Sequence, residues 1–306
     1  MNSRVASERF AERAPSVQPR FAIVTPSYRR DFERCRLLCE TMDRQVSGFD
    51  RHYILVEKRD VTLFRQLAGA RRTIIDERAL LPGWLRPFDD PTSLFRRRIW
   101  LSLRTKPLRG WHVQQLRRIA VAGHVPEDIL VYCDSDVAFL KPFDCGIFQR
   151  DGKTRLFRRD DGLEGRRLAD HHVWSDNAAK LLGITERSRL RHDYITTLIA
   201  WRRDTQLAMC RHIEDVAGRH WAEAIGAERK FSECIIYGRY VDEVLGGADH
   251  FHGSQDYCRV QWWDSLSDAE LEAFIASMAP EQVAIGLQSF ISNDIGRVRR
   301  LIERVA

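Results

Sequence analysis

Short apolar runs alternate with longer amphipathic segments along the first half of the chain. Each run predicts a buried strand, and the runs lie at residues 21–25, 52–56, 72–75 and 129–133. In the other segments apolar residues recur every three or four positions, which predicts helices at residues 31–42, 61–67, 94–104 and 111–122. Because strands that alternate with helices form parallel sheets covered on both faces, we predict an α/β fold with three layers, α/β/α, around a mostly parallel central sheet.

The pattern in the second half of the chain is more mixed. It predicts strands and helices; the strands lie at residues 137–140, 154–157 and 194–201, and the helices at residues 173–182, 205–216, 234–244 and 295–305. No Gly-, Pro- or Ser-rich linker divides the chain, so we predict one domain over residues 20–306. Residues 1–19 lack the apolar core that a signal peptide needs and predict a flexible tail.

The chain is basic, and its basic residues are nearly all arginines. It has 49 Lys and Arg against 43 Asp and Glu, a net charge of +6, and 43 of the 49 are Arg. Guanidinium groups suit phosphate oxygens, but a bias in composition would give the same ratio. The basic residues are dispersed among acids and no nucleic-acid-binding motif is present, so we expect no nucleic-acid partner. We expect only a few arginines, Arg118 and Arg29 among them, to bind phosphate.

The cysteines and the hydropathy of the chain bear on its compartment. The seven cysteines are scattered without a C-x-x-C pair, which favours a reducing compartment over a zinc site or a disulfide framework. No stretch approaches the ~20 apolar residues that a membrane-spanning helix needs. We therefore predict a cytoplasmic protein and leave open a peripheral contact with the inner face of the cytoplasmic membrane.

The strongest chemical signal is the tripeptide Asp134-Ser135-Asp136. It separates two apolar runs, and carboxylates in such a position are costly unless they are paired, hydrogen-bonded or bound to a metal. In an extended chain, positions i and i+2 point the same way, so Asp134 and Asp136 can address one cation. Mn²⁺ and Mg²⁺ bind carboxylate oxygens together with substrate phosphates. We predict a Mn²⁺ or Mg²⁺ site here; the alternative is an Asx-type turn at the end of a strand.

Two segments together resemble the GT-A class of nucleotide-sugar glycosyltransferases. They are residues 21–28, Phe-Ala-Ile-Val-Thr-Pro-Ser-Tyr, and the Asp-Ser-Asp at residues 134–136. Three further segments are similar to parts of a bacterial, largely uncharacterised GT-A-like family, and they lie at residues 110–116, 192–197 and 231–238. The similarity extends over about residues 21–290, so it implies a GT-A-like sandwich for nearly the whole folded chain.

The resemblance implies a metal-dependent enzyme that moves a sugar from a nucleotide-diphosphate sugar to a hydroxyl of a saccharide or lipid-linked acceptor. Residues 20–140 would form its nucleotide-binding half and residues 141–306 its acceptor-binding half. Two other classes of function are kept as alternatives. One is a metal-dependent nucleotidyltransferase or phosphotransferase, although no Gly-rich phosphate loop is present. The other is a basic nucleic-acid-binding protein.

Carried over position by position, the resemblance implies a set of donor-binding residues. The set comprises Thr25, Pro26, Tyr28, Glu57, Gln114, Gln115, Arg118 and Asp134. The first three would line the nucleotide at the end of the first strand, and Glu57 would hydrogen-bond the base or ribose unless it is a solvated loop acid. The two glutamines would bind sugar hydroxyls unless they are exposed helix residues, and Arg118 could reach a phosphate.

A further metal ligand is implied by the comparison with glycogenin-like members of the class. These enzymes take a ligand from a His-Phe-x-Gly segment, and residues 250–253 of this chain are His-Phe-His-Gly. Either His250 or His252 would then join the two aspartates at the metal ion. The segment that follows lacks the Lys-Pro-Trp of those enzymes, and ordinary loop composition also explains two histidines beside a glycine.

Two acids are candidates for the general base that deprotonates the acceptor hydroxyl. Glu233 precedes an apolar run and so lies at the start of a helix, where inverting GT-A enzymes place such an acid. Stabilisation of the positive helix end would equally explain an acid there. Asp193 is the second candidate, as a base or as a ligand of sugar hydroxyls. Trp174 could stack on a sugar ring or be a half-buried surface residue.

Overall fold

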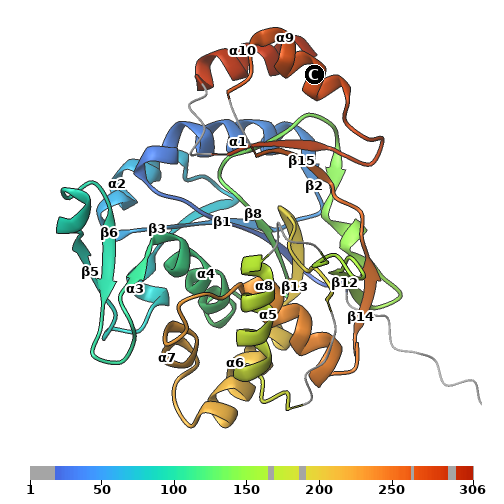
Figure 1. Ribbon diagram of the computed structural model, residues 1–306. Coiled ribbons are helices and arrows are strands. Elements are labelled where there is room, and N and C mark those ends of the chain that lie inside the picture. The colour runs from blue at the N-terminus through green and yellow to red at the C-terminus, as the bar shows by residue number, and fades with distance from the viewer. Residues whose placement is uncertain (1–17, 165–168, 186–190, 263–264, 289–293, 306) are drawn as a thin grey trace, which may run out of the picture.

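The computed structural model describes residues 18–164, 169–185, 191–262, 265–288 and 294–305 (Figure 1). Within them the chain is a mixed α/β protein built around a five-stranded sheet. The predicted tail at residues 1–19 lies almost wholly outside the described residues.

The central sheet has its strands in the order β13-β8-β1-β3-β4. These strands are β1 (Phe21–Pro26), β3 (Arg51–Val56), β4 (Arg72–Asp76), β8 (Ile129–Cys133) and β13 (Leu198–Arg202). The first four run parallel to one another, and β13 pairs antiparallel with β8 at one edge. The mostly parallel sheet that the apolar runs predict is therefore confirmed.

Helices cover both faces of this sheet (Figure 1). They are α1 (Phe32–Gln45) on one face, and α4 (Gly110–Ala120), α6 (Arg203–Ala217) and α8 (Glu233–Arg239) on the other. Successive side chains of a strand point to opposite faces, so each strand contributes to two cores. On β1, Ala22 and Val24 pack in the core that includes α4, whereas Phe21 and Ile23 pack in the core that includes α1. This double burial explains why the central strand β8 is buried and apolar along its whole length.

After β8 the chain passes into a second sheet. Strand β9 (Val137–Phe139) pairs with β16 (Ala284–Leu287), which pairs with β15 (Cys258–Gln261). The Asp134-Ser135-Asp136 tripeptide therefore lies at the junction of two sheets. Outside this junction, further strands are β2 (Val46–Ser47), β10 (Phe143–Asp144), β11 (Gln149–Arg150), β12 (Lys153–Phe157) and β14 (His250–Gly253).

The remaining helices lie around these sheets. They are α2 (Val61–Phe64), α3 (Glu77–Leu80), α5 (Ala169–Leu181), α7 (Trp221–Gly226), α9 (Asp268–Ala276) and α10 (Ile295–Val305). The amphipathic pattern predicts the last of these correctly: Leu301 and Ile302 pack in a third core together with residues of α1, β9 and β16.

The predicted helix at residues 94–104 is wrong. In its place an antiparallel sheet forms from β5 (Arg86–Asp89), β6 (Arg98–Leu101) and β7 (Leu108–Arg109). Leu94 and Phe95 have φ angles of 52° and 60°, a left-handed conformation that a right-handed helix does not accommodate. Trp100 is buried whereas Leu94 is exposed, so the apolar residues of this segment do not form one stripe.

Two other predicted elements differ at their ends. The strand predicted at residues 194–201 starts only at Leu198, since the carboxylate of Asp193 accepts a hydrogen bond from the backbone N–H of Ile195 at 3.0 Å and the chain turns there. The helix predicted at residues 234–244 is α-helical to Arg239 and continues as a π-helical segment, Tyr240–Val244.

All seven cysteines are buried and free. Within the described ranges, none of the helices is both long enough and apolar enough to cross a membrane.

Candidate active site

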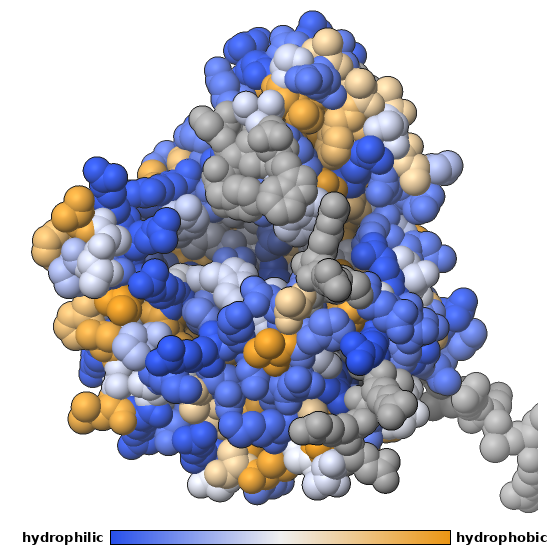
Figure 2. Space-filling view, viewed as in Figure 1, coloured by the Kyte–Doolittle hydropathy of each residue, from blue (hydrophilic) through white to orange (hydrophobic). Residues whose placement is uncertain are grey.

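A cavity of about 1810 Å³ opens at the carboxyl ends of β1, β3 and β8. Its other walls come from α4, α5, β15 and the start of α8. Figure 2 shows this face of the molecule hollowed near its centre, with mostly hydrophilic residues around the hollow. Open α/β sheets bind ligands beyond the carboxyl ends of their strands. A pocket for one small ligand measures about 300–1,000 Å³, so this cavity has room for two substrates.

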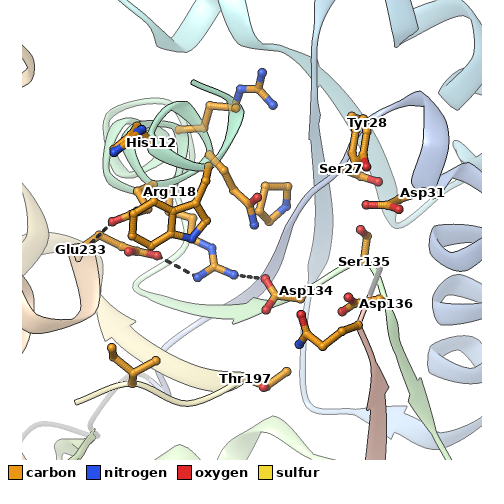
Figure 3. A pocket seen from close by; sticks show the side chains of 18 of the residues that line it. Ser27, Tyr28, Asp31, His112, Arg118, Asp134, Ser135, Asp136, Thr197 and Glu233 are labelled. Carbon is orange, nitrogen blue, oxygen red and sulfur yellow. Dashed lines mark hydrogen bonds and ion pairs between the residues drawn. The ribbon is translucent and has the colours of Figure 1, made fainter. Parts of the chain in front are cut away.

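Arg118 joins two acids at the centre of the cavity (Figure 3). It lies in the last turn of α4, and its guanidinium is almost wholly buried. Its Nη1 donates to Oε1 of Glu233 at 2.9 Å, and its Nη2 donates to Oδ1 of Asp134. One cation thus links α4, the end of β8 and the first residue of α8, three elements that are far apart in the sequence.

Burial and charge act in opposite directions on this group of residues. Burial alone would lower the pKa of Arg118, but the carboxylates of Asp134 and Glu233 outweigh it and raise that pKa. Burial raises the pKa of Glu233, and the adjacent guanidinium opposes that rise. The backbone N–H of Glu233 also donates to Oε1 of Gln115 at 2.9 Å. Arg118 is therefore a permanent cation that keeps Glu233 in a fixed position.

A third acid, Asp31, lies at the end of the cavity that holds Asp134 and Asp136 (Figure 3). Burial raises its pKa to about 6; Arg34 opposes this shift and the charge of Asp134 adds to it. The sequence interpretation missed Asp31 because it took this residue for the start of a helix. The signal that could have found it is its position after β1, since the carboxyl ends of neighbouring parallel strands meet at one edge.

The chemistry of this acidic end suits a hard divalent cation. Among the described residues, no group of three or more His, Cys, Asp or Glu side chains is arranged to hold a metal ion by itself. Mg²⁺, however, is commonly bound through one or two carboxylates together with waters and substrate phosphates. Asp134 and Asp136 both line the cavity and fit that arrangement. One oxygen of Asp134 is engaged by Arg118, so a cation there would share this carboxylate with the guanidinium.

The structure does not bring His250 or His252 to the two aspartates. Neither histidine lines the cavity. His250 is buried in β14, where its Nδ1 contacts the carbonyl oxygen of Ala248 at 2.6 Å and its Nε2 contacts the hydroxyl of Tyr237 at 2.9 Å. His252 pairs through Nε2 with Oδ1 of Asp242 at 2.8 Å. Both side chains have other partners, so the expectation that either completes the metal site is not met.

Three of the four residues expected to contact the nucleotide line the cavity: Pro26, Tyr28 and Glu57. Glu57 is flanked by two arginines, with Oε2 3.0 Å from Nε of Arg59. Thr25 does not line it. Its side chain lies on the face of β1 that also carries Phe21 and Ile23, because residues two apart share a face, and its Oγ1 contacts Nε2 of His52 at 3.0 Å.

Gln114, Gln115 and Asp193, all candidate site residues from the sequence, also line the cavity. The Nε2 of Gln115 is buried without a hydrogen-bond partner among the described residues. An unsatisfied buried donor costs free energy, and a ligand oxygen would remove that cost. Asp193 is the carboxylate of this group. Burial raises its pKa, and its Oδ2 lies 3.9 Å from Nη1 of Arg159.

Arginines contribute far more to the cavity than the sequence interpretation allows. Twelve of the described arginines line it: Arg29, Arg30, Arg34, Arg59, Arg96, Arg97, Arg98, Arg109, Arg117, Arg118, Arg159 and Arg259. They come from at least six separate segments, so no run in the sequence marks them as a group. Arg96, Arg97 and Arg98 are consecutive, but the helix predicted over residues 94–104 did not indicate that they would reach the cavity.

These features define the class of the protein: a mixed α/β protein with a large cavity, rich in arginine and holding an acidic pair, at the carboxyl ends of parallel strands. The chain belongs to a family of unknown function, DUF6492, whose sequence model matches residues 21–268. The match includes the central sheet and every site residue discussed above. No curated protein matches the sequence.

Proposed function

We propose that the protein is a metal-dependent glycosyltransferase of the GT-A type. It would transfer a sugar from a nucleotide-diphosphate sugar to a hydroxyl group of a saccharide or lipid-linked acceptor in the cytoplasm. One observation carries the proposal: Asp134 and Asp136, at the junction of two sheets, both line a cavity that has room for a donor and an acceptor.

The residues of the chain divide between the two ends of the donor. A Mn²⁺ or Mg²⁺ ion held by Asp134 and Asp136 would neutralise charge on the diphosphate leaving group. The arginines of the cavity would hold the diphosphate through charge-assisted hydrogen bonds, with Arg118 next to the acidic pair. Tyr28 and Glu57, which follow β1 and β3 and line the cavity, would contact the nucleoside.

We assign the base role to Asp193 in preference to Glu233. Burial raises the pKa of both carboxyl groups, so the choice rests on their partners. Oε1 of Glu233 accepts a hydrogen bond from Nη1 of Arg118 at 2.9 Å, which holds this carboxylate in place and opposes the rise of its pKa. The guanidinium that pairs with Asp193, that of Arg159, lies 3.9 Å from Oδ2, too far for a hydrogen bond. Glu233 would act as a positioning residue for Arg118.

Thermal unfolding with UDP-, GDP- and CMP-linked sugars, each with and without Mn²⁺, tests the proposal. One nucleotide class is expected to raise the midpoint temperature, and to do so more strongly with the metal. Asp136→Ala should abolish the metal-dependent part, whereas Asp176→Ala, an exposed acid on α5 outside the cavity, should keep it. No stabilisation by any of these ligands, or a metal effect that survives Asp136→Ala, would contradict the proposal.

The base assignment has its own test in donor hydrolysis or transfer assays. Asp193→Asn should keep nucleotide affinity and lower the rate of transfer by roughly 10²–10⁴-fold. Glu233→Gln should change nucleotide affinity through Arg118. If Asp193→Asn transfers at the rate of the unaltered protein, Asp193 is not the base.

A further inference from the structure

Four aromatic side chains form one wall of the cavity, which we call the aromatic wall: Trp111 and His112 of α4, and His171 and Trp174 of α5. The ring centroids of Trp111 and Trp174 are 5.4 Å apart, and those of His171 and Trp174 are 4.5 Å apart in a stacked arrangement. Trp111 remains 47% exposed although it is one of the largest apolar side chains of the protein. A large aromatic face left open inside a cavity is typical of a ligand-binding surface.

The wall is uncharged and has a carboxylate beside it. Burial lowers the pKa of both His112 and His171, so both imidazoles are neutral at pH 7. Asp193 lines the same cavity and lies close enough to His171 for its carboxylate to oppose the effect of burial on the pKa of that imidazole. A neutral aromatic face therefore lies near the carboxylate of Asp193, while Arg109 and Arg159 are close enough to act on His112 and Asp193 at its margins.

A pyranose ring matches this combination of groups. One of its faces presents C–H groups, which pack on an aromatic ring through dispersion and the hydrophobic effect, while its edge carries hydroxyl donors. A carboxylate accepts hydrogen bonds from such hydroxyls through both oxygens. A phosphate or another anion would instead favour the arginine-lined walls.

The aromatic wall also lies on the side of the acidic pair that is opposite to the proposed nucleoside end. Figure 3 shows His112 and Glu233 on one side of Arg118 and Asp134, with Ser27, Tyr28 and Asp31 on the other. The nucleoside end proposed above is on the side of Tyr28. A ring held on the aromatic wall would therefore approach the reacting centre from the side opposite the nucleoside, with a hydroxyl available to Asp193.

We propose that the aromatic wall, together with Asp193, binds a neutral pyranose ring of the acceptor. This inference rests on the proposed function in one respect: the assignment of the ring to the acceptor and not to the donor. The binding site itself follows from the wall and its adjacent carboxylate.

Binding of methyl glycosides of glucose, galactose, mannose and N-acetylglucosamine tests the inference. Saturation-transfer NMR and titration are run with the protein alone and again with saturating nucleoside diphosphate and Mn²⁺, so that ordered binding is also covered. At least one glycoside should bind, and Trp111→Ala and Trp174→Ala should each weaken it about tenfold or more. Trp111→Phe should restore most of the affinity, and Val173→Ala, an exposed neighbour on α5, should have no effect.

The remaining outcomes separate this inference from the proposed function. In the Ala variants, nucleoside diphosphate affinity should change less than twofold, which also shows that the variants are folded. Glycoside binding without any nucleotide binding would sink the transferase proposal and keep the saccharide site. Nucleotide binding with no glycoside bound under either condition would contradict the inference that the aromatic wall binds a pyranose. If the Ala variants lose affinity for the nucleotide sugar but not for the glycosides, the aromatic wall binds the donor sugar and the inference is wrong. If a free nucleoside perturbs the aromatic wall, the wall binds the base, and the inference is also wrong.

Discussion

Arg118 shares its charge between Glu233, which is buried, and Asp134, which is partly exposed, so its removal affects the whole centre of the cavity. A buried ion pair that loses one partner typically costs about 3–5 kcal/mol, because the other charge is left buried and uncompensated. We expect Arg118→Met to lower the free energy of unfolding by about that amount, measured by urea unfolding at pH 8. Arg304→Met, a matched control in an exposed pair, should cost less than about 1 kcal/mol.

A double variant, Arg118→Met with Glu233→Gln, tests the cause of the lost stability. If the loss arises from uncompensated carboxylates, adding Glu233→Gln to Arg118→Met should recover part of it. A double variant that is as unstable as the sum of its two single changes would show that packing, and not charge, accounts for the effect.

Asp31 is the opposite case, a buried acid whose ionisation works against folding. Its folded-state pKa of about 6 lies above the ordinary value of 3.8, so the folded state holds the proton more tightly than the unfolded state does. Stability therefore falls as pH rises from about 4 to about 6 and stays lower above that range. At pH 8 the penalty amounts to about 3 kcal/mol, from 1.36 kcal/mol per unit of pKa.

Asp31→Asn should consequently stabilise the protein at pH 8, and the gain should fall to roughly half at pH 5. Unfolding in urea across this pH range measures both values. A gain that does not depend on pH would contradict the shifted pKa. If Asp31 also contributes to cation binding, the same variant should lose metal-dependent stabilisation by nucleotide, which separates its stability role from its ligand role.

At the residue scale, the sequence supplies the chemistry of the site more reliably than its geometry. Asp134 was identified from residue type and from its position between apolar runs, whereas Gln115 and Arg118 were carried over from segment similarity on a helix, and all three line one cavity. Thr25 and His250 were carried over in the same way onto strands, and neither lines the cavity, because segment similarity does not record the face of a strand on which a side chain lies. A shift of one position on a strand reverses that face, so such residues are misplaced most easily.

At the scale of elements, α8 is fixed by a very close contact with the chain that precedes β13. A Cβ added at Gly238 would lie 2.2 Å from the ring of Tyr194. That ring is buried, and its hydroxyl donates to Oδ2 of Asp242 at 2.7 Å, so it cannot move aside easily. Gly238→Ala should lower the free energy of unfolding by about 3 kcal/mol.

Gly123→Ala provides the control for this prediction, because an added Cβ there meets no atom within 4 Å. It should change the free energy of unfolding by less than about 1 kcal/mol. Equal effects of the two substitutions, measured by the same urea titration, would mean that helix propensity and not the contact with Tyr194 decides the outcome.

The elements themselves could be predicted wherever both faces of a strand or one stripe of a helix are buried. β1, β8 and α1 follow directly from such patterns. The sheet of β5, β6 and β7 could not be predicted, because its strands are short and arginine-rich and depend on cross-strand pairing that a local window does not contain. This missed sheet is also what brings Arg98 to Glu57.

At the scale of the whole molecule, much of the positive charge behind the net charge of +6 is found on arginines that line the cavity. Many of the cavity's arginines face a common space, so small polyphosphates should bind there with a strong dependence on salt. We expect nucleoside diphosphates at about 100 times Kd to stabilise the fold by about 2.7 kcal/mol, measured by thermal unfolding. The gain should decline as NaCl rises, and the corresponding nucleosides should give a much smaller one.

Duplex DNA supplies the contrasting measurement for this prediction. If the positive charge serves an enclosed site, DNA should bind weakly at physiological salt and should not compete with the nucleoside diphosphate. Tight DNA binding that displaces the nucleotide would instead support the nucleic-acid-binding alternative.

The buried thiols give the protein a built-in reporter. Cys234 and Cys258 both line the cavity, and burial raises the pKa of each thiol well above its usual range, so a thiol reagent attacks them slowly while the walls stay closed. The rate at which these two cysteines are alkylated then measures how often the walls around α8 and β15 open. Substrates that close the cavity should protect them, and the motion that admits donor and acceptor can be timed in the unaltered chain by mass spectrometry.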